Sequence, residues 1–340
     1  MVSLVGKTAH RLGQVHRRDV SMSDEPSATN VSILIVAYNA REFIERCLSS
    51  IPAACKGISY EVLLIDNGTD GTAELVRDKF ANLKVIPSQG NVGYGQGNNI
   101  AASQASSSSE LYVVLNPDTE LHAEAISKLV IVARNNPGFG ALAGAITEDD
   151  QADVVQPLVA IPDVWSLAFG IVGLGKYWAQ ARLPKADSAD LFEMEALNGA
   201  FVAIRRTVWE ALGGFDETFF LYCEDADISL RISQLGMKLG MVRSSKTRHD
   251  VGSGHSYSPV RQYYLFTGNA HFANKHFGTL KKTAYKTTLW LAALTRFLGA
   301  TAMQGQNKKM KEMAKAYRDL ALRPWKWFAG YDSRGADPRR

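Results

Sequence analysis

The chain has 340 residues and a net charge of +4, with 46% hydrophobic and 21% charged residues, which is typical of a globular protein that buries one large core or a core and a smaller subdomain. Its three cysteines, Cys47, Cys55 and Cys223, are an odd number, which argues against a disulfide framework and for a reducing compartment. Residues 1–29 contain no apolar run long enough for a signal peptide, and we expect them to form a flexible tail.

The first half of the chain alternates short β-branched runs with amphipathic stretches, the pattern of βαβ units in a mostly parallel sheet. The first expected helix begins at Asn39, which would cap it together with Glu42, and ends at Pro52. This half has the outline of a Rossmann-like nucleotide-binding unit. The sequence predicts strands at 31–37, 60–65, 83–86 and 111–115, and further helices at 70–80, 93–105 and 124–134.

The second half is less regular. Residues 140–195 alternate only weakly, and their apolar stretch at 164–175 suits either the core or an acceptor groove. Beyond them the patterns predict strands at 197–205 and 238–242 and helices at 207–212, 224–235 and 260–276.

The end of the chain is basic, because residues 281–340 hold fourteen Lys and Arg against four Asp and Glu. Residues 287–303 are apolar but contain Arg296 and are shorter than the roughly 20 residues of a spanning helix. The lysines, arginines and tryptophans after them suit an amphipathic helix on anionic lipid, with a helical pair packed on the domain as the alternative. No nucleic-acid-binding module is recognisable, so we expect a membrane surface and no nucleic acid as partner.

Polar residues follow each of the first four expected strands. In open parallel sheets, ligands bind outside the carboxyl ends of the strands, so these groups would converge on one crevice. A pyrophosphate there would need a divalent cation, which takes only one or two protein carboxylates. Each segment also has a structural alternative: Asp66 as part of a turn, Asp70 as a helix cap, and the glycines of 93–97 as sites of close helix packing.

Several segments in order carry a resemblance to a known family: VSILIVAYN, LLIDNGTDGT, NVGYGQGNN, VVLNPDTEL and LNGAFVAIRRTVWEALGGFDETFFLYCEDADISLRI, followed by His249. Together they resemble glycosyltransferase family 2, and within it the bacterial rhamnosyltransferase-like branch, from about Val31 to Gly278. The resemblance implies an α/β GT-A fold, a Rossmann-like mostly parallel sheet flanked by helices. It also implies inversion at the anomeric carbon and Mg²⁺ or Mn²⁺ between protein and diphosphate.

The resemblance divides the chain into a nucleotide-sugar-binding half at 30–139, an acceptor-binding and catalytic half at 140–279, and a basic helical extension at 280–340. It implies that Asp66 accepts a hydrogen bond from a uracil or thymine ring, and that Asp118 and His249 bind the metal, with His255 as the alternative to His249. Asn116 stands where the family's Asp-x-Asp motif has its first carboxylate. The donor-binding residues implied are Ala37, Tyr38, Asn39, Asp66, Asn67, Asn91, Gly93, Asn116 and Asp118.

For the reaction itself, the resemblance implies that Asp225, beside Glu224, removes the acceptor proton. The alternative is that acidic residues simply favour a helix N-terminus, which explains Asp227 best. Gly268 replaces an Arg common in the family, and Arg261 or Arg248 would substitute for it. Asp216 is expected to organise its loop. The acceptor-side residues implied are Gly199, Ala200, Trp209, Gly214 and Phe215.

The main hypothesis is therefore an inverting transferase that uses dTDP-rhamnose, or else a UDP-sugar, and acts on a saccharide or polyprenyl-linked acceptor for cell-surface polysaccharide. It would be cytoplasmic, at the inner face of the plasma membrane. The alternatives are a non-catalytic nucleotide-sugar-binding or scaffold subunit, and another Rossmann-type enzyme such as a nucleotidyltransferase. Self-association is left open.

Overall fold

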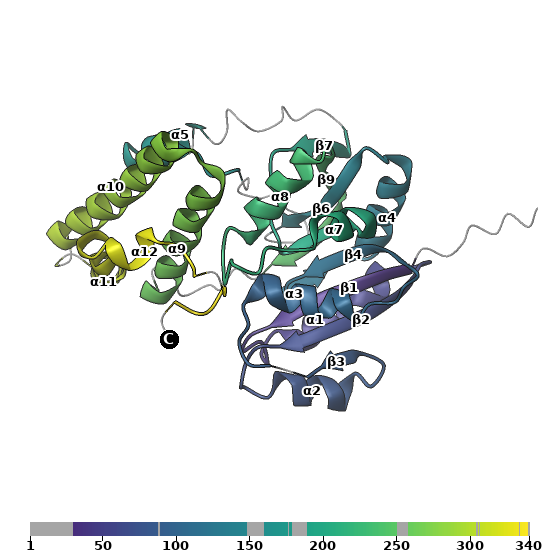
Figure 1. Cartoon of the computed structure of the whole chain (residues 1–340). Coiled ribbons are helices and arrows are strands. Elements are labelled where there is room, and N and C mark those ends of the chain that lie inside the picture. The colour runs from purple at the N-terminus through teal and green to yellow at the C-terminus, as the bar shows by residue number, and fades with distance from the viewer. Residues whose placement is uncertain are drawn as a thin grey trace, which may run out of the picture.

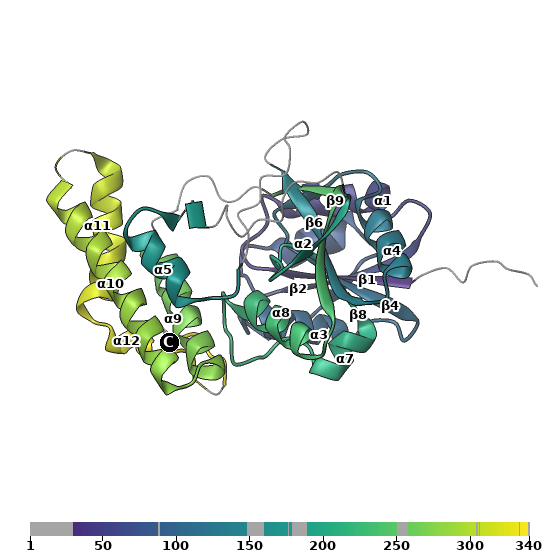
Figure 2. The ribbon, with the colours of Figure 1, turned by 90° about the horizontal axis from the view of Figure 1, so that it is seen from above.

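The computed structural model describes residues 30–87, 89–147, 160–175, 177–178, 189–249, 258–303, 305, 307–332 and 334–338. The expected tail at 1–29 and His255 lie outside this part of the chain. Within it, a nine-stranded sheet with helices on both faces forms one body, and a cluster of helices lies beside it (Figures 1 and 2).

The first half forms the parallel part of the sheet, in the order β3-β2-β1-β4. All four predicted strands and all four predicted helices are present. The strands are β1 (Asn30–Ala37), β2 (Ser59–Asp66), β3 (Lys84–Ile86) and β4 (Ser109–Leu115). The helices are α1 (Ile44–Ala54), α2 (Thr72–Lys79), α3 (Tyr94–Ser103) and α4 (Ala125–Asn135).

The sheet continues in the order β8-β6-β9-β5, with β7 paired to β9. Strand β8 runs antiparallel to β4 and β6, β6 runs parallel to β9, and β5 and β7 run antiparallel to β9. Six of the nine strands therefore share one direction, which confirms the α/β class with a mostly parallel sheet. The bounds are β5 (Thr119–Leu121), β6 (Phe139–Thr147), β7 (Leu191–Met194), β8 (Phe201–Arg205) and β9 (Lys238–His249).

Strand β1 shows why the sheet is buried on both faces. Every residue from Val31 to Ala37 is buried, and successive side chains point to opposite sides. Ile33 and Ile35 belong to the core under α1 and α4, whereas Leu34 and Val36 belong to the core under α3. The nearly continuous apolar run of this strand is thus shared between two cores.

Two local predictions at the first helix are wrong. Helix α1 begins at Ile44 rather than Asn39, because Asn39 has a φ of 50° and its side chain instead accepts a hydrogen bond from the backbone of Thr69. Pro52 does not end the helix, which continues to Ala54. Pro52 lies on the exposed face of the last turn, and burial of Ala54 stabilises the remaining residues despite the missing N–H.

The remaining helices are α5 (Val164–Ile171), α7 (Arg206–Leu212), α8 (Glu224–Gln234), α9 (Pro259–His276), α10 (Thr279–Met303), α11 (Lys308–Leu322) and α12 (Trp325–Phe328). The apolar stretch at 164–175 contributes α5, which packs on α10 in the cluster. Its residues Val164 and Leu167 are partly buried against a third hydrophobic core.

This third core joins the C-terminal helices to the loop before α8. Trp327 and Tyr285 are almost completely buried in it, and Phe219 and Phe220 enter it from the loop. The extension is thus a helical group packed on the domain, and its expected contact with a membrane stays a prediction. No helix in the described ranges is both long and apolar enough to cross a membrane.

Candidate active site

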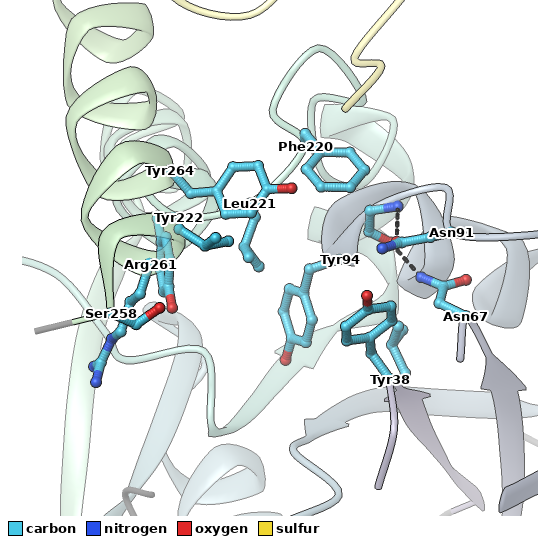
Figure 3. Close-up of a pocket in the computed structure, with 13 residues that line it drawn as sticks. Tyr38, Asn67, Asn91, Tyr94, Phe220, Leu221, Tyr222, Ser258, Arg261 and Tyr264 are labelled. Atoms are coloured by element: carbon cyan, nitrogen blue, oxygen red, sulfur yellow. Dashed lines mark hydrogen bonds between the residues drawn. The ribbon is translucent and has the colours of Figure 1, made fainter. Parts of the chain in front are cut away.

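The ends of β1 and β2 and the loop before α3 are tied together by short polar contacts. The backbone N–H of Asn67 donates to the carbonyl of Ala37 at 2.7 Å, and its side-chain nitrogen donates to the carbonyl of Gly93 at 2.9 Å. The N–H of Gly93 in turn donates to Asn91 Oδ1 at 3.1 Å (Figure 3). Three predicted donor-binding segments therefore meet at one edge of the sheet.

Gly93 is required for this arrangement. Its φ is +91°, and a Cβ at this position would lie 2.6 Å from the carbonyl oxygen of Phe220. The close approach brings the loop before α8 against the strand ends, and the N–H of Tyr94 donates to the same carbonyl at 3.0 Å.

The position of Asp66 fits both of its interpretations, as part of a turn and as a donor-binding residue. Its two carboxylate oxygens accept from the backbone N–H groups of Gly68, at 2.8 Å, and Ala73, at 3.0 Å, so it orders the turn into α2. The same residue lines a polar pocket with Thr69 and Ile86 beside the end of β2. Asp70 accepts from the N–H and hydroxyl of Thr72 and so supports the start of α2, as the cap alternative expected, although the cap position itself is Gly71.

We call the cavity in Figure 3 the central cleft. Strand-end residues form one wall, and the loop before α8 and the start of α9 form the other. Four tyrosines and a phenylalanine are among the residues that line it, and several of them were not predicted from the sequence. The residues that line it include Tyr38, Asn67, Asn91, Tyr94, Phe220, Leu221, Tyr222, Ser258, Arg261 and Tyr264.

Of the two cations considered as substitutes at Gly268, only Arg261 lines the central cleft. Arg248 is paired with Glu120 on β5, at 2.5 Å. A Cβ on Gly268 would lie 2.4 Å from the carbonyl oxygen of Tyr222, so the packing of α9 against the loop before α8 leaves no room for a side chain.

Asp118 and His249 are brought together by a strand that the sequence pattern did not reveal. Strand β5 directly follows Asp118 and pairs with β9 so that Thr119 lies opposite His249. His249 Nε2 lies 3.0 Å from Asp118 Oδ1, and both side chains are largely buried, with 13% and 29% exposed. The described residues contain no group of three or more His, Cys, Asp and Glu side chains arranged to hold a metal ion.

Tyr94 lies between the Asp118 region and the acidic start of α8. Its hydroxyl is 2.8 Å from Asn116 Oδ1 and 2.9 Å from the carbonyl oxygen of Gly199, and its single proton serves these two acceptors. Burial raises its pKa well above the usual range, and the nearby acidic groups of Glu224, Asp225 and Asp118 add to the rise. Tyr94 thus links Asn116, two residues before Asp118, to Gly199, which lies beside Asp225. The only sequence signal for Tyr94 was its place directly after Gly93.

The start of α8 holds Glu224 and Asp225 after two residues of positive φ, Tyr222 and Cys223. Burial raises the pKa of both acids, that of Glu224 to about 8, and the adjacent Asp225 charge adds to the rise at Glu224. Asp225 accepts hydrogen bonds from the backbone of Ala226, at 2.8 Å, and of Gly199, whereas Glu224 Oε2 has no hydrogen-bond partner in the described part of the chain. These hydrogen bonds favour the charged form of Asp225, and the unpartnered Oε2 favours the protonated form of Glu224.

Asp227 has a role that the helix-dipole explanation does not cover. Its side chain is completely buried and pairs with Arg231 at 2.7 Å, Lys275 at 2.6 Å and His276 at 2.7 Å, which ties α8 to α9. Asp216 joins the network through Lys275 and also accepts from the backbone and hydroxyl of Thr218. It organises its loop, as expected.

The acceptor-side residues are split between the site and the core. Gly199 lies beside Asp225 and Tyr94, and the carbonyl of Ala200 accepts from the N–H of Asn116 at 2.9 Å. Trp209 and Phe215 are instead buried in the core, with their rings packed edge to face at 5.3 Å. Gly214 lies against Asn99 with a φ of +77°. None of these three lines the central cleft, although Phe215 lines a small cavity together with Gly199 and Asp225.

Comparison with known proteins agrees with this geometry. Residues 32–165 match the family model described as glycosyl transferase family 2. An N-acetylglucosaminyl-diphospho-decaprenol L-rhamnosyltransferase of Mycobacterium tuberculosis is 28% identical over 70% of this chain and 84% of its own length. Rhamnosyltransferase WbbL of Escherichia coli strain K12 is 24% identical over 64% of this chain and 83% of its own length.

Two solved structures resemble the whole arrangement. A mannosyltransferase of Pyrobaculum calidifontis in complex with GDP-Man and Mn²⁺ has a TM-score of 0.55 at 16% identity, over 91% of this chain and 86% of the other. GalNAc-T7 with UDP, GalNAc and Mn²⁺ also has a TM-score of 0.55, at 17% identity, over 90% of this chain and 59% of the other. Residues 32–165 therefore match a glycosyl transferase family 2 domain, and the structural likeness shows that the chain has the GT-A fold.

Proposed function

We propose that this chain is a glycosyltransferase that transfers a sugar, with inversion, to a saccharide or lipid-linked acceptor of cell-surface polysaccharide. The first candidate donor is dTDP-rhamnose, and the second is a UDP-sugar. The observation that carries the proposal is the position of Tyr94, whose hydroxyl lies 2.8 Å from Asn116 Oδ1, two residues before Asp118, and 2.9 Å from the carbonyl oxygen of Gly199, which lies beside Asp225. Rhamnosyl transfer is supported by the two relatives named as rhamnosyltransferases.

The donor nucleotide would lie along the strand ends of residues 30–139. Ala37, Tyr38 and Asn39 would contact the nucleoside, and Asp66, at the end of β2, would accept from the N–H of its base. Asn67, Asn91 and Gly93 are already joined by hydrogen bonds, so they form a prearranged edge for the sugar and phosphates. Arg261, which lines the central cleft, is the candidate cation for the diphosphate.

A divalent cation, Mg²⁺ or Mn²⁺, fits Asp118 and His249. An imidazole nitrogen and a carboxylate oxygen 3.0 Å apart can point at one ion, and such ions need few protein ligands when phosphate oxygens and water complete the shell. Asn116, beside them, offers an amide oxygen but no charge. When bound, the cation would offset the charge that develops on the departing diphosphate.

Asp225 would act as the general base. It accepts the proton of the acceptor hydroxyl while that oxygen forms a bond to the anomeric carbon and the bond from this carbon to the diphosphate oxygen breaks. Asp225 accepts hydrogen bonds from two backbone N–H groups, which fix its orientation and favour its charged form. Glu224 would stay protonated beside it. Residues 140–279, which include Gly199 and Ala200, would bind the acceptor.

The test is a screen of nucleotide sugars with Mg²⁺ or Mn²⁺, read as release of nucleoside diphosphate. We expect dTDP-rhamnose or a UDP-sugar to be used, and Asp225→Asn to lose at least about a hundredfold in turnover while it still binds the donor. Asp118→Asn and His249→Ala should weaken the response to metal. Donor binding by calorimetry without any product, in every acceptor mixture, would favour the non-catalytic alternative, and pyrophosphate release from a nucleoside triphosphate would favour a nucleotidyltransferase.

A further inference from the structure

A second cavity lies next to the central cleft. It is formed by the start of α9 together with α11 and α12, and we call it the basic groove. Val260, in the first turn of α9, lines both cavities, so the two are neighbours across a single side chain. An occupant of the groove would therefore lie close to whatever fills the cleft.

The chemistry of the basic groove is mixed. Lys315, Arg318 and Lys326 contribute three cations, all on exposed side chains, and the partly exposed Tyr263 and the exposed Val260 contribute apolar surface. Within the described part of the chain, none of these three cations takes part in an ion pair. One acidic residue, Asp319, also lines the groove, but it is paired with Arg323 at 3.7 Å.

This combination matches a ligand that has a compact double negative charge next to an apolar chain. Lysine and arginine are the usual partners of phosphate oxygens, and aromatic and aliphatic walls favour hydrocarbon. The groove also lies at the start of α9, and the N-terminal end of a helix favours anions. A neutral saccharide alone would leave the three cations without a partner.

We infer that the basic groove binds the diphosphate and first isoprenoid units of a lipid-linked saccharide acceptor, while the sugar of that acceptor reaches into the central cleft past Val260. This inference rests on the proposed function, because it assigns the groove to the acceptor of that reaction. It makes the C-terminal helices part of the substrate-binding surface and not only a contact with the membrane.

The test is a binding measurement on the full chain with farnesyl diphosphate as the probe, in EDTA so that no metal-dependent donor site contributes. The groove variant Lys315→Ala/Arg318→Ala/Lys326→Ala should bind the probe at least about tenfold more weakly than the unaltered chain. The control Lys308→Ala/Lys309→Ala/Lys311→Ala removes the same charge from the same region of the chain outside the groove, and should stay within about twofold. Lys315→Arg/Lys326→Arg should retain binding, and farnesol should bind equally to all variants.

Unchanged binding in the groove variant, or an equal loss in both triple variants, would overturn the inference. A third arm uses vesicles of phosphatidylglycerol: if the groove variant loses vesicle binding but keeps farnesyl diphosphate, the groove is a membrane contact instead. Because the measurement needs no turnover, its failure is separate from failure of the proposed transferase activity, which the donor screen reads.

Discussion

Glu224 and Asp225 show how two adjacent carboxyl groups can acquire different roles. Both are buried, but the backbone N–H groups of Ala226 and Gly199 reach only Asp225, and an oxygen of Glu224 has no partner among the described residues. Glu224 receives only the hydrogen bond of its own backbone N–H, and burial with so few donors favours the protonated form of a carboxyl, because its charged form is poorly solvated. The charged form is therefore favoured at Asp225, the residue we propose as the base.

The raised pKa of Glu224 predicts an unusual pH dependence of stability. The folded chain keeps a proton until about pH 8 that the unfolded chain releases near pH 4.5, so the unfolded state binds fewer protons between these values. The free energy of unfolding should therefore fall as the pH rises through this window, by up to about 1.4 kcal/mol per unit.

Glu224→Gln tests this prediction, because glutamine has nearly the same shape and does not titrate. Urea unfolding at pH 5, 6.5 and 8 should show that the advantage of the variant over the unaltered chain grows with pH. The exposed Glu193→Gln should run parallel to the unaltered chain. A constant difference between Glu224→Gln and the unaltered chain would show that Glu224 ionises normally in the folded state.

The hydroxyl of Tyr94 positions Asn116 and the Gly199 segment through two hydrogen bonds. Tyr94→Phe removes these two hydrogen bonds. The ring and its edge contact with Phe215 are retained, but Asn116 and the Gly199 carbonyl lose a donor. We expect kcat to fall about tenfold, the effect of one lost buried hydrogen bond, and the metal concentration for half-maximal rate to rise, because Asn116 lies beside Asp118. A purely structural role would leave that metal concentration unchanged. Tyr112→Phe, in the core outside the cleft, is the control.

At the scale of elements, the network around Asp227 fixes α8 against α9 and so fixes the position of Asp225 relative to the wall of the cleft. Asp227→Asn would leave Arg231, Lys275 and His276 without the carboxylate that they share, and only Lys275 would keep another, that of Asp216. Loss of one partner from a buried ionic network costs about 3–5 kcal/mol, and we expect a loss of this size in the free energy of unfolding. Glu45→Gln, which breaks the half-exposed pair with Lys79, should cost less than about 1 kcal/mol.

The elements that the sequence predicted well are those whose pattern is local. The strand at 31–37 and the helix at 260–276 differ from β1 and α9 by one residue at a boundary. Strand β6 was missed because FGALAGAIT is rich in small residues, which carry little β signal although all but the first residue are buried. Strand β5 has three residues, and only its pairing with β9 defines it.

In the candidate site too, residues that a local pattern indicates were predicted, and residues that only tertiary packing brings in were not. Residues at strand ends, such as Asp66 and Asp118, could be anticipated because a parallel sheet brings such ends to one edge. Trp209 and Phe215 were placed on the acceptor side although they lie in the core, since a motif does not reveal which of its aromatic residues face inward. Tyr222, Arg261 and Tyr264 reach the central cleft only through the packing of α9, which no local pattern specifies.

At the scale of the whole molecule, the C-terminal helices and the site form one structure. Tyr331, beyond α12, packs against Phe219 and Phe220, and its hydroxyl donates to the carbonyl of Leu221 in the wall of the central cleft. Removal of the extension would therefore expose the third core and disturb the cleft at the same time. Point substitutions in the extension separate its structural role from its proposed role at the membrane more cleanly than a deletion.

Substitutions of Trp327 and Trp325 can separate the structural role of the extension from its proposed role at the membrane. The two residues are two positions apart but differ in environment. Trp327 is completely buried and donates to the carbonyl of Leu320, whereas the side chain of Trp325 is 68% exposed. Trp327→Ala should lower the free energy of unfolding by about 3–5 kcal/mol, measured by urea denaturation, and reduce activity because the wall of the cleft depends on the third core. Trp325→Ala should change stability by less than about 0.5 kcal/mol.

The same pair tests the proposed contact with the membrane. An exposed tryptophan among lysines is suited to the interface of an anionic bilayer, so Trp325→Ala should weaken binding to phosphatidylglycerol vesicles in a sedimentation assay while turnover on a soluble acceptor stays unchanged. Equal vesicle binding by Trp325→Ala and the unaltered chain would place the membrane contact elsewhere or remove it. If Trp325→Ala instead unfolded as readily as Trp327→Ala, the assignment of the third core would be wrong, since only one of the two rings lies within it.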